Sequence, residues 1–404
     1  MRLCPAPCSP TTGPQAGRHR GAGRFTAGDH VNKNLFLFGT LRHAPLLEIV
    51  AGTLPVTVAA VREGYRIAPS GDGDWPVLVQ EPGAMAQGLV IRDIAPDVLD
   101  RLRHYESAYD MHLSQCQVSI GDEVVSADVF VPGAPSHVDP GTWDLADWGA
   151  RRAALDCIAA AEIMQLWGRF SGDELRFRVT QIEARAGSRL RAGQMPPPHE
   201  VGQGPQTPMA RVQGQFDDHA GYFFTRTFDL DYATFDGGTS EVVRREVFLA
   251  PDAAIVLPYD PVRDRVLLVE QFRMGPFARG EALPWMLEPV AGRVDPGETP
   301  EDCARREAVE EADLDLRALH HVASCYPSPG CSTEYFHIYL GICELPDAET
   351  GSHGLAEEHE DIRTHVLSYD AAMELVSSGE AQNAPLILSL MWLSGKRSLL
   401  RGAA

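Results

Sequence analysis

Short apolar runs separated by turn residues dominate the first half of the chain, and they predict β-strands. Between them, 96–105 has apolar residues at helical spacing and predicts a helix. An alanine-rich stretch, 144–168, predicts one long helix, and another helix is expected after Ser171. The predicted strands of this half are 33–39, 55–61, 76–80, 86–91 and 115–131.

The apolar pattern stops at 187–208, where a proline triplet and scattered glycine and glutamine indicate a linker. Strands are predicted beyond it, near 221–234, 242–257 and 265–270, and two amphipathic helices fill 369–400. This pattern is typical of two α+β domains. The predicted organisation is a disordered tail over 1–32, a first domain over 33–187, a linker over 188–215 and a second domain over 216–404.

Composition narrows the class of protein. The 404 residues carry 35 Lys and Arg against 56 Asp and Glu, a formal net charge of -21, which argues against nucleic-acid binding. No run approaches the roughly 20 apolar residues that span a bilayer, so no membrane association is expected. The 8 cysteines form no CxxC pair and are too sparse for a disulfide framework, which favours the cytoplasm.

Part of the acid excess is concentrated in one segment, 292–314 (GRVDPGETPEDCARREAVEEADL). Thr299 and Pro300 are typical of a helix start. Carboxylates then crowd one helix face, with Glu307 and Glu311 four residues apart, and such like-charged neighbours repel each other. A solvated acidic face would normally intersperse lysines, so the pattern indicates ligands for a hard cation such as Mg²⁺.

The spacing of this segment resembles the Nudix box of Nudix hydrolases, G-x5-E-x7-R-E-U-x-E-E-x-G-U with U apolar. Asp313 stands where the family has a glycine that ends the helix in a left-handed conformation, which Asp also tolerates. Further stretches resemble the ADP-ribose pyrophosphatase subgroup, namely 257–273, 285–293, 328–334 and 354–365. The matching box residues are Gly292, Glu298, Arg306, Glu307, Glu310 and Glu311.

This resemblance implies an α/β/α Nudix sandwich that hydrolyses ADP-ribose to AMP and ribose 5-phosphate. It implies a small-molecule nucleoside diphosphate substrate, Mg²⁺ or else Mn²⁺ as cofactor, and a homodimer that exchanges N-terminal strands. Glu307, Glu311, the carbonyl of Ala291 and Glu360 would hold the metal, and Glu358 would be the general base. The loop EEHED that carries these last two acids could instead be a solvated turn.

For the substrate, the resemblance implies contacts from Arg245, Glu246, Arg273 and Glu334. Arg273 could instead form a structural ion pair. An aromatic ring would stack on adenine, with Phe223, Phe224 and Phe228 left as alternatives. A pyrophosphatase for another nucleoside diphosphate sugar or a dinucleotide, or a ligand sensor without turnover, remains open.

The first domain has a weaker motif, an apolar strand that leads directly into Gly39-Thr40-Leu41, followed later by Glu106 at the end of a helix pattern. The two together resemble the γ-glutamylcyclotransferase-like (AIG2-like) family, a small mixed barrel, with Phe38 in place of the usual Tyr. The resemblance implies that the turn binds a γ-glutamyl group and that Glu106 shuttles a proton as 5-oxoproline is released. Taken alone, Glu106 could equally be a surface acid.

Overall fold

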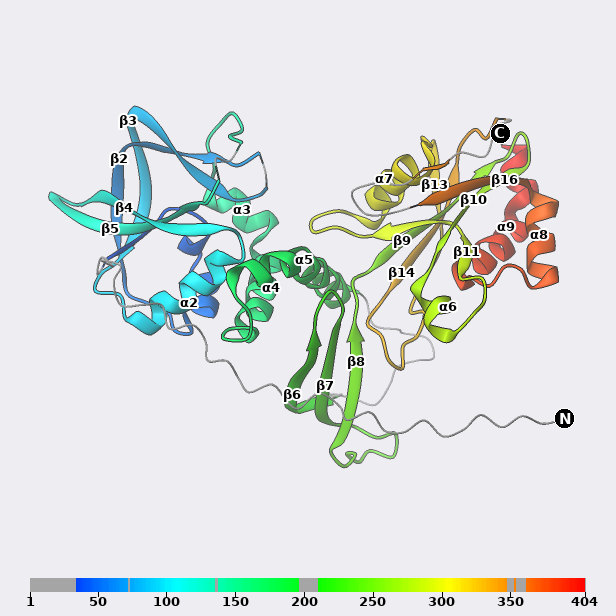
Figure 1. The fold of residues 1–404 in the computed structure, drawn as a ribbon, viewed down its shortest axis with the longest axis horizontal. Coiled ribbons are helices and arrows are strands. Elements are labelled where there is room, and N and C mark those ends of the chain that lie inside the picture. The colour runs from blue at the N-terminus through cyan, green and yellow to red at the C-terminus, as the bar shows by residue number, and fades with distance from the viewer. Residues whose placement is uncertain are drawn as a thin grey trace.

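The computed structural model describes residues 34–71, 73–134, 137–195, 210–346, 352–353 and 361–403. The tail predicted over 1–32 lies outside these ranges, as do Glu358 and Glu360. Two α+β units flank a central helix, α5, with a small three-stranded sheet beside them (Figure 1). This arrangement confirms the predicted fold class.

The N-terminal unit is a closed barrel with strand order β1-β3-β2-β4-β5. Strand β3 is one long strand, whereas two separate strands were predicted over 76–80 and 86–91. The connecting residues, 81–85, lie near the bulge between Glu63 and Tyr65 and are largely exposed, so their side chains do not alternate between core and solvent as those of a half-buried strand would. The strands are β1 (Leu35–Leu37), β2 (Thr57–Pro69), β3 (Pro76–Ile91), β4 (Met111–Ile120) and β5 (Glu123–Pro132).

Helices cover one side of this barrel and bury a shared core that includes Trp148 and Leu102. The single helix predicted over 144–168 is wrong, because the chain leaves helical geometry at Arg152 (φ −121°, ψ −27°). Gly149, a poor helix former, precedes the break. The elements are η1 (Thr40–Arg42), α1 (Ala44–Ala51), α2 (Pro96–Ser107), α3 (Leu145–Arg151), α4 (Ala153–Gln165) and α5 (Gly172–Gln194).

The C-terminal unit is a sandwich around an eight-stranded sheet ordered β13-β14-β9-β10-β16-β15, with β11 beside β10 and β12 beside β9. Alternate residues of its strands face opposite layers. Val256 packs toward α7, and Leu257 packs toward α8 and α9. The bounds are β9 (Ala253–Asp260), β10 (Arg265–Phe272), α6 (Met274–Arg279), β11 (Trp285–Glu288), β12 (Val290–Arg293), α7 (Pro300–Ala312), β13 (Ala318–Cys325), β14 (Phe336–Ile342), β15 (Ser352–His353), β16 (Ile362–Ser368), α8 (Tyr369–Ser378) and α9 (Ala384–Gly402).

The three-stranded sheet consists of β6 (Ala210–Ala220), β7 (Phe224–Tyr232) and β8 (Val243–Leu249). The range predicted as a linker, 188–215, includes the ends of two regular elements. Residues 188–194 are the last turns of α5, and 210–215 already belong to β6. The end of this helix could not be predicted because Gly187 and Gly193 are poor helix formers and the apolar periodicity is lost there.

Among the helices in the described ranges, none is long and apolar enough to cross a membrane. The cysteines of those same ranges are free thiols, with Cys116, Cys303 and Cys343 buried.

Helix α5 is joined to the C-terminal unit through Asp252, whose side chain is 5% exposed. The Asp252 carboxylate accepts a hydrogen bond from Arg191 Nε at 2.7 Å and contacts His337 at 3.4 Å. Its backbone N–H donates to Ser188 Oγ at 2.8 Å. Burial alone would raise the pKa of Asp252, but the contacts with His337 and Arg191 outweigh it and lower the pKa.

We expect Asp252→Asn to lower the free energy of unfolding by about 2 kcal/mol, because a buried hydrogen-bonded charge is lost. A lowered folded-state pKa stabilises the fold above the unfolded pKa, about 3.9, and that contribution disappears as pH falls through the folded value. Urea unfolding of both proteins between pH 7 and pH 3 measures this. The difference should be constant down to about pH 4 and then shrink. A constant difference across the whole range would contradict the assignment, and exposed Asp315→Asn is the control.

Candidate active sites in the two domains

The acidic helix α7 begins and ends as the sequence predicts. Thr299 is its N-cap, and the Thr299 hydroxyl accepts a hydrogen bond from the backbone N–H of Asp302. Asp313 is the C-cap, in the left-handed conformation at φ 51° and ψ 42°. The replacement of the family's glycine therefore leaves the helix end intact, which confirms the interpretation of this position.

Arg306 forms ion pairs with three of the carboxylates that crowd this segment. Its guanidinium lies 2.9 Å from Glu298, 2.7 Å from Glu307 and 2.9 Å from Glu310. Burial alone would raise the pKa of Glu298, but hydrogen bonds from Arg306 and the Asp295 amide lower it. One cation thus holds three acids in fixed positions beside the loop that precedes the helix.

The donor set in this loop fits a hard cation. Glu311 is buried at 3% exposure, and its carboxylate accepts a hydrogen bond from the Ala291 amide at 3.2 Å. A Cβ at Gly292 would lie 1.8 Å from Glu307 Oε1, so only glycine lets this carboxylate approach the strand. Carboxylate and carbonyl oxygens are the ligands that Mg²⁺ prefers. Within the ranges that the structure covers, no cluster of three or more His, Cys, Asp or Glu side chains is placed to hold a metal.

Next to this loop lies a cavity of about 410 Å³, here called the C-terminal cavity. Arg273, Glu334, Ala291 and Gly292 line it, so four residues predicted from the sequence come together. Arg245 and Glu246 do not line it; both are exposed on β8. The other lining residues are Gln181, Arg185, Tyr222, Phe223, Phe248, Leu249, Ala250, Pro251, Asp252, Ala253, Ile255, Glu288, Pro289, Arg293, Phe336, Asn383 and Pro385.

The charged residues of this cavity are partly preorganised. Arg273 forms an ion pair with Glu288, with Nε to Oε2 at 2.8 Å, while its side chain remains 39% exposed. The second oxygen of Glu288 accepts a hydrogen bond from Asn383 at 3.0 Å. Burial raises the pKa of Glu334, and the nearby charge of Arg273 opposes the rise. The ion pair anticipated as an alternative for Arg273 is therefore present, and it positions Arg273 at the cavity.

The structure distinguishes among the candidate aromatic residues. Phe223 lines the cavity and is 57% exposed, whereas Phe224 is 1% exposed. Phe223 packs against Tyr222 and Phe248, with ring centroids at 5.1 Å and 5.3 Å. Tyr222 and Phe248 line the cavity as well and had no signal in the sequence, because only the folded β7 and β8 bring them together.

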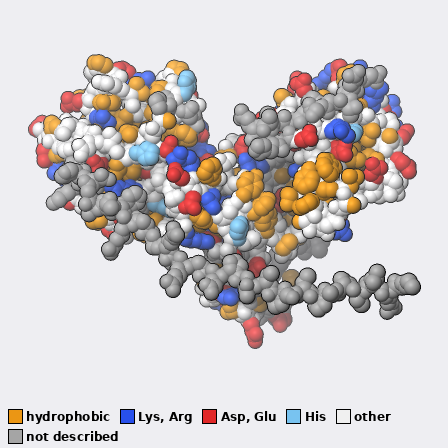
Figure 2. Space-filling model, viewed as in Figure 1, with side chains coloured by type: hydrophobic (Ala, Val, Ile, Leu, Met, Phe, Trp, Pro, Cys, Tyr) orange, Lys and Arg blue, Asp and Glu red, His pale blue; other side chains and the backbone are white. Residues whose placement is uncertain are grey.

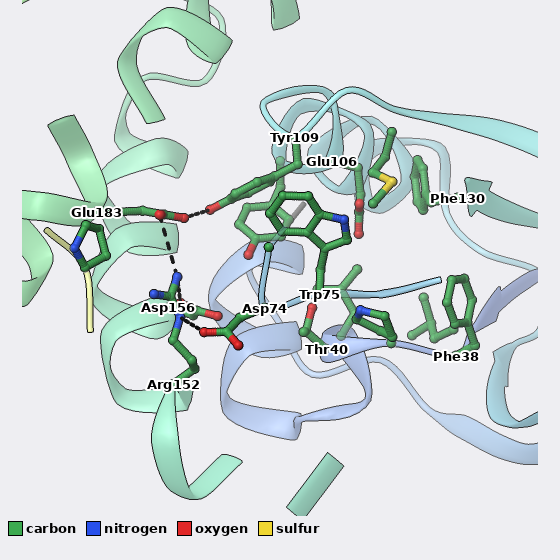
Figure 3. Close-up of a pocket in the computed structure, with 18 of the residues that line it drawn as sticks. Phe38, Thr40, Asp74, Trp75, Glu106, Tyr109, Phe130, Arg152, Asp156 and Glu183 are labelled. Carbon is green, nitrogen blue, oxygen red and sulfur yellow. Dashed lines mark hydrogen bonds and ion pairs between the residues drawn. The ribbon is translucent and has the colours of Figure 1, made fainter. Parts of the chain in front are cut away.

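A second cavity, of about 600 Å³, opens in the barrel unit and is here called the N-terminal cavity. Gly39, Thr40, Leu41 and Glu106 line it, as the sequence motif predicts. Sequence reasoning missed the polar group on its other side, Asp74, Arg152, Asp156 and Glu183, which lies opposite Glu106 and Phe130 (Figure 3). These residues come from separate elements without a shared motif.

The electrostatics of the N-terminal cavity favour proton transfer. Desolvation raises the pKa of Glu106 to about 8, although its side chain still faces the cavity. Burial also raises the pKa of Asp156 to about 6, against the attraction of Arg152 at 3.1 Å. The Tyr109 hydroxyl donates to Glu183 at 3.2 Å. A carboxyl group with a pKa near the working pH is suited to general acid–base chemistry.

Comparison with known proteins follows the same division of the chain. Residues 249–390 match the NUDIX domain model, and residues 35–149 match the gamma-glutamyl cyclotransferase, AIG2-like, model. The ADP-ribose pyrophosphatase of Escherichia coli strain K12 is 43% identical over 175 residues, which cover 43% of this chain and 83% of that protein. The chain therefore belongs to the Nudix hydrolase family.

Other relatives differ in the substrate that their names give. The ADP-ribose pyrophosphatase of Haemophilus influenzae is 39% identical over 184 residues, 45% of this chain and 84% of that protein. The GDP-mannose pyrophosphatase of Salmonella choleraesuis is 36% identical over 174 residues, 43% of this chain and 88% of that protein. A solved structure described as an ADP compounds hydrolase has a TM-score of 0.36 and 19% identity, covering 48% of this chain and 98% of that one.

We expect Gly292→Ala to disable the C-terminal site, since the added Cβ would overlap the Glu307 carboxylate. The loss should be at least about tenfold in kcat/KM for the nucleotide substrate, with little change in melting temperature. Gly275→Ala, where an added Cβ meets nothing within 4 Å, is the matched control and should retain activity. Full activity of Gly292→Ala would show that Glu307 does not need this close approach.

Proposed function

We propose that the C-terminal domain hydrolyses the diphosphate bond of ADP-ribose and releases AMP and ribose 5-phosphate. The named activity of relatives at 43% and 39% identity supports this substrate. The single structural observation that carries the proposal is the junction of the acidic loop with the C-terminal cavity, where Ala291 and Gly292 form part of the wall. A cavity of about 410 Å³ suits a small ligand of this kind.

We propose Mg²⁺ as the cofactor, with Mn²⁺ able to replace it. Glu307, Glu311 and the Ala291 carbonyl would hold the ion, together with Glu360. Such an ion would neutralise the diphosphate and lower the pKa of a bound water. Glu358 would then accept the proton of the attacking water. Arg273, positioned by Glu288, would attract the anionic diphosphate, and Glu334 would contact the substrate beside it.

The named activity of the Salmonella relative supports a second candidate substrate, a guanine nucleotide sugar such as GDP-mannose. The box residues position the diphosphate and its metal, and they leave the base and the sugar unspecified. A panel of nucleoside diphosphate sugars and dinucleotides with added Mg²⁺ separates these candidates. Binding without hydrolysis of any member of the panel would instead indicate a ligand sensor.

Glu311→Gln should lower AMP release from ADP-ribose by at least about a hundredfold, because a buried ligand carboxylate loses its charge. The measurement is AMP formation by chromatography at saturating Mg²⁺. Glu374→Gln on the exposed face of α8 makes the same chemical change away from both cavities and should not affect the rate. Equal rates for wild type and Glu311→Gln would overturn the proposal.

We further propose that the N-terminal domain is a γ-glutamylcyclotransferase. In this reaction the substrate's α-amine attacks its own γ-carbonyl, the amide bond breaks, and 5-oxoproline and a free amine leave. Glu106 would take a proton from the attacking amine and pass it to the departing amine nitrogen, and the Gly39–Leu41 turn would bind the γ-glutamyl group. The raised pKa of Glu106 at the cavity wall supports this role.

Because Glu106 must be ionised to accept a proton, 5-oxoproline release should rise with pH, reach half its maximum near pH 8 and level off about one pH unit higher. Glu106→Gln should abolish the release across the same range. Assays with γ-glutamyl amines between pH 6 and pH 9.5 measure both effects. Release by Glu106→Gln at the rate of wild type would exclude Glu106 as the proton acceptor.

We also propose that the protein is a cytoplasmic homodimer joined through its C-terminal domains. Hydrophobic side chains gather over α6 and β11 in Figure 2. They include Phe272, Phe277 and Trp285, which are 41%, 55% and 48% exposed, and the Phe272 ring contacts both of the others. An apolar patch of this kind is typical of protein–protein contact. Sedimentation velocity of the purified chain distinguishes one copy from two.

A further inference from the structure

Helix α5 separates the two cavities and contributes side chains to both. Thr180 and Glu183 line the N-terminal cavity, whereas Gln181 and Arg185 line the C-terminal cavity. Residues four apart lie on one face of a helix, so Gln181 and Arg185 share a side. Neither family match includes α5, since one ends at residue 149 and the other begins at residue 249. This wall of the C-terminal cavity therefore comes from a segment that neither family match covers.

Gln181 has unused hydrogen-bonding capacity at this wall. The side chain is only 8% exposed, and within the described part of the chain its carboxamide makes no hydrogen bond. Because Gln181 lines the cavity, its amide donors and its carbonyl acceptor are available to a ligand there. Its neighbour Arg185 is already engaged, with Nε 3.1 Å from Glu162 Oε1.

The position of Gln181 is fixed by the contacts of its helix. Arg178 Nε donates to the carbonyl of Ala220 at 3.0 Å, immediately before the aromatic residues of the cavity. The Arg185 guanidinium lies 5.1 Å from the Phe224 ring. Together with the bonds of Ser188 and Arg191 to Asp252, these contacts hold α5 against the C-terminal domain along its length.

The surroundings of Gln181 fit a planar base. Tyr222, Phe223 and Phe248 line the same cavity and offer aromatic faces on which a base can stack. Arg273 and Glu334 line it as well and suit the phosphate and sugar portions. We propose that Gln181 recognises the base of the nucleotide substrate and makes the C-terminal cavity selective for adenine. This inference rests on the proposed hydrolysis of nucleotide sugars and adds the residue that reads the base.

The chemistry of the carboxamide explains the selectivity. Its NH₂ group donates and its oxygen accepts, which matches the adjacent acceptor nitrogen and amino donor on the edge of adenine. A carboxylate at the same position only accepts hydrogen bonds. It would lose the bond to the adenine nitrogen but match the two neighbouring donors of guanine, its ring N–H and its amino group.

The test is a matched pair of substrates, ADP-mannose and GDP-mannose, which differ only in the base. For Gln181→Glu, the ratio of kcat/KM for adenine over guanine should fall at least about tenfold relative to wild type. For Gln181→Leu, KM for the adenine substrate should rise with kcat nearly unchanged, since the base lies away from the diphosphate. Gln194, exposed at the end of the same helix, gives the matched controls Gln194→Glu and Gln194→Leu, which should keep the wild-type ratio.

Binding of AMP and GMP to the same proteins, measured by calorimetry, tests base recognition without requiring hydrolysis. It therefore distinguishes a failure of this inference from a failure of the proposed function. If wild type binds AMP in preference to GMP but hydrolyses no nucleotide sugar, the proposed function fails and base recognition stands. An unchanged base preference in both folded Gln181 variants, by rate and by binding, would overturn the inference. So would a wild-type protein that binds neither nucleotide. If Gln181→Glu does not fold, the uncharged Gln181→Leu decides, because it should lose the preference for AMP.

Discussion

Both cavities depend on how α5 is held at Asp252. This carboxylate is buried, and burial of a charge is costly unless hydrogen bonds compensate. Arg191 and His337 provide the compensation from two different domains, and Ser188 adds a bond to the backbone. These hydrogen bonds and contacts reach Asp252 from several directions. They fix α5 in both position and rotation, so that one face is presented to the barrel and another to the sandwich.

A second electrostatic constraint operates within the C-terminal domain. The strongly acidic composition is not spread evenly, because several carboxylates meet around a single guanidinium, that of Arg306. Like charges at these distances would otherwise repel one another and splay the helix start from its loop. The Glu311 carboxylate accepts a hydrogen bond from the Ala291 amide. Some of the residues that appear as an excess of charge in the composition thus form an ordered group around one arginine.

The features that could be predicted are those formed by residues close together in the sequence. The box from Gly292 to Asp313 spans one turn and one helix, so its spacing determines its geometry, including the left-handed end at Asp313. The Gly39–Leu41 turn and Glu106 were found in the same way. Residues such as Gln181 gave no signal, because a lone glutamine on an amphipathic helix becomes informative only when a distant sheet covers it. The predicted ends of helices were wrong where an alanine-rich stretch favours a continuous helix but the folded chain is interrupted, as at Arg152.

Arg293 lines both cavities, one residue beyond Gly292 and at the end of the strand that leads into the acidic loop. The two cavities are therefore separated by as little as one residue. That residue belongs to the C-terminal domain, so the boundary between the cavities differs from the boundary between the domains along the chain. A C-terminal fragment cut out at the apparent linker would keep every residue of the family motif and lose one wall of its own cavity. Each domain therefore contributes residues to the walls of the other domain's cavity.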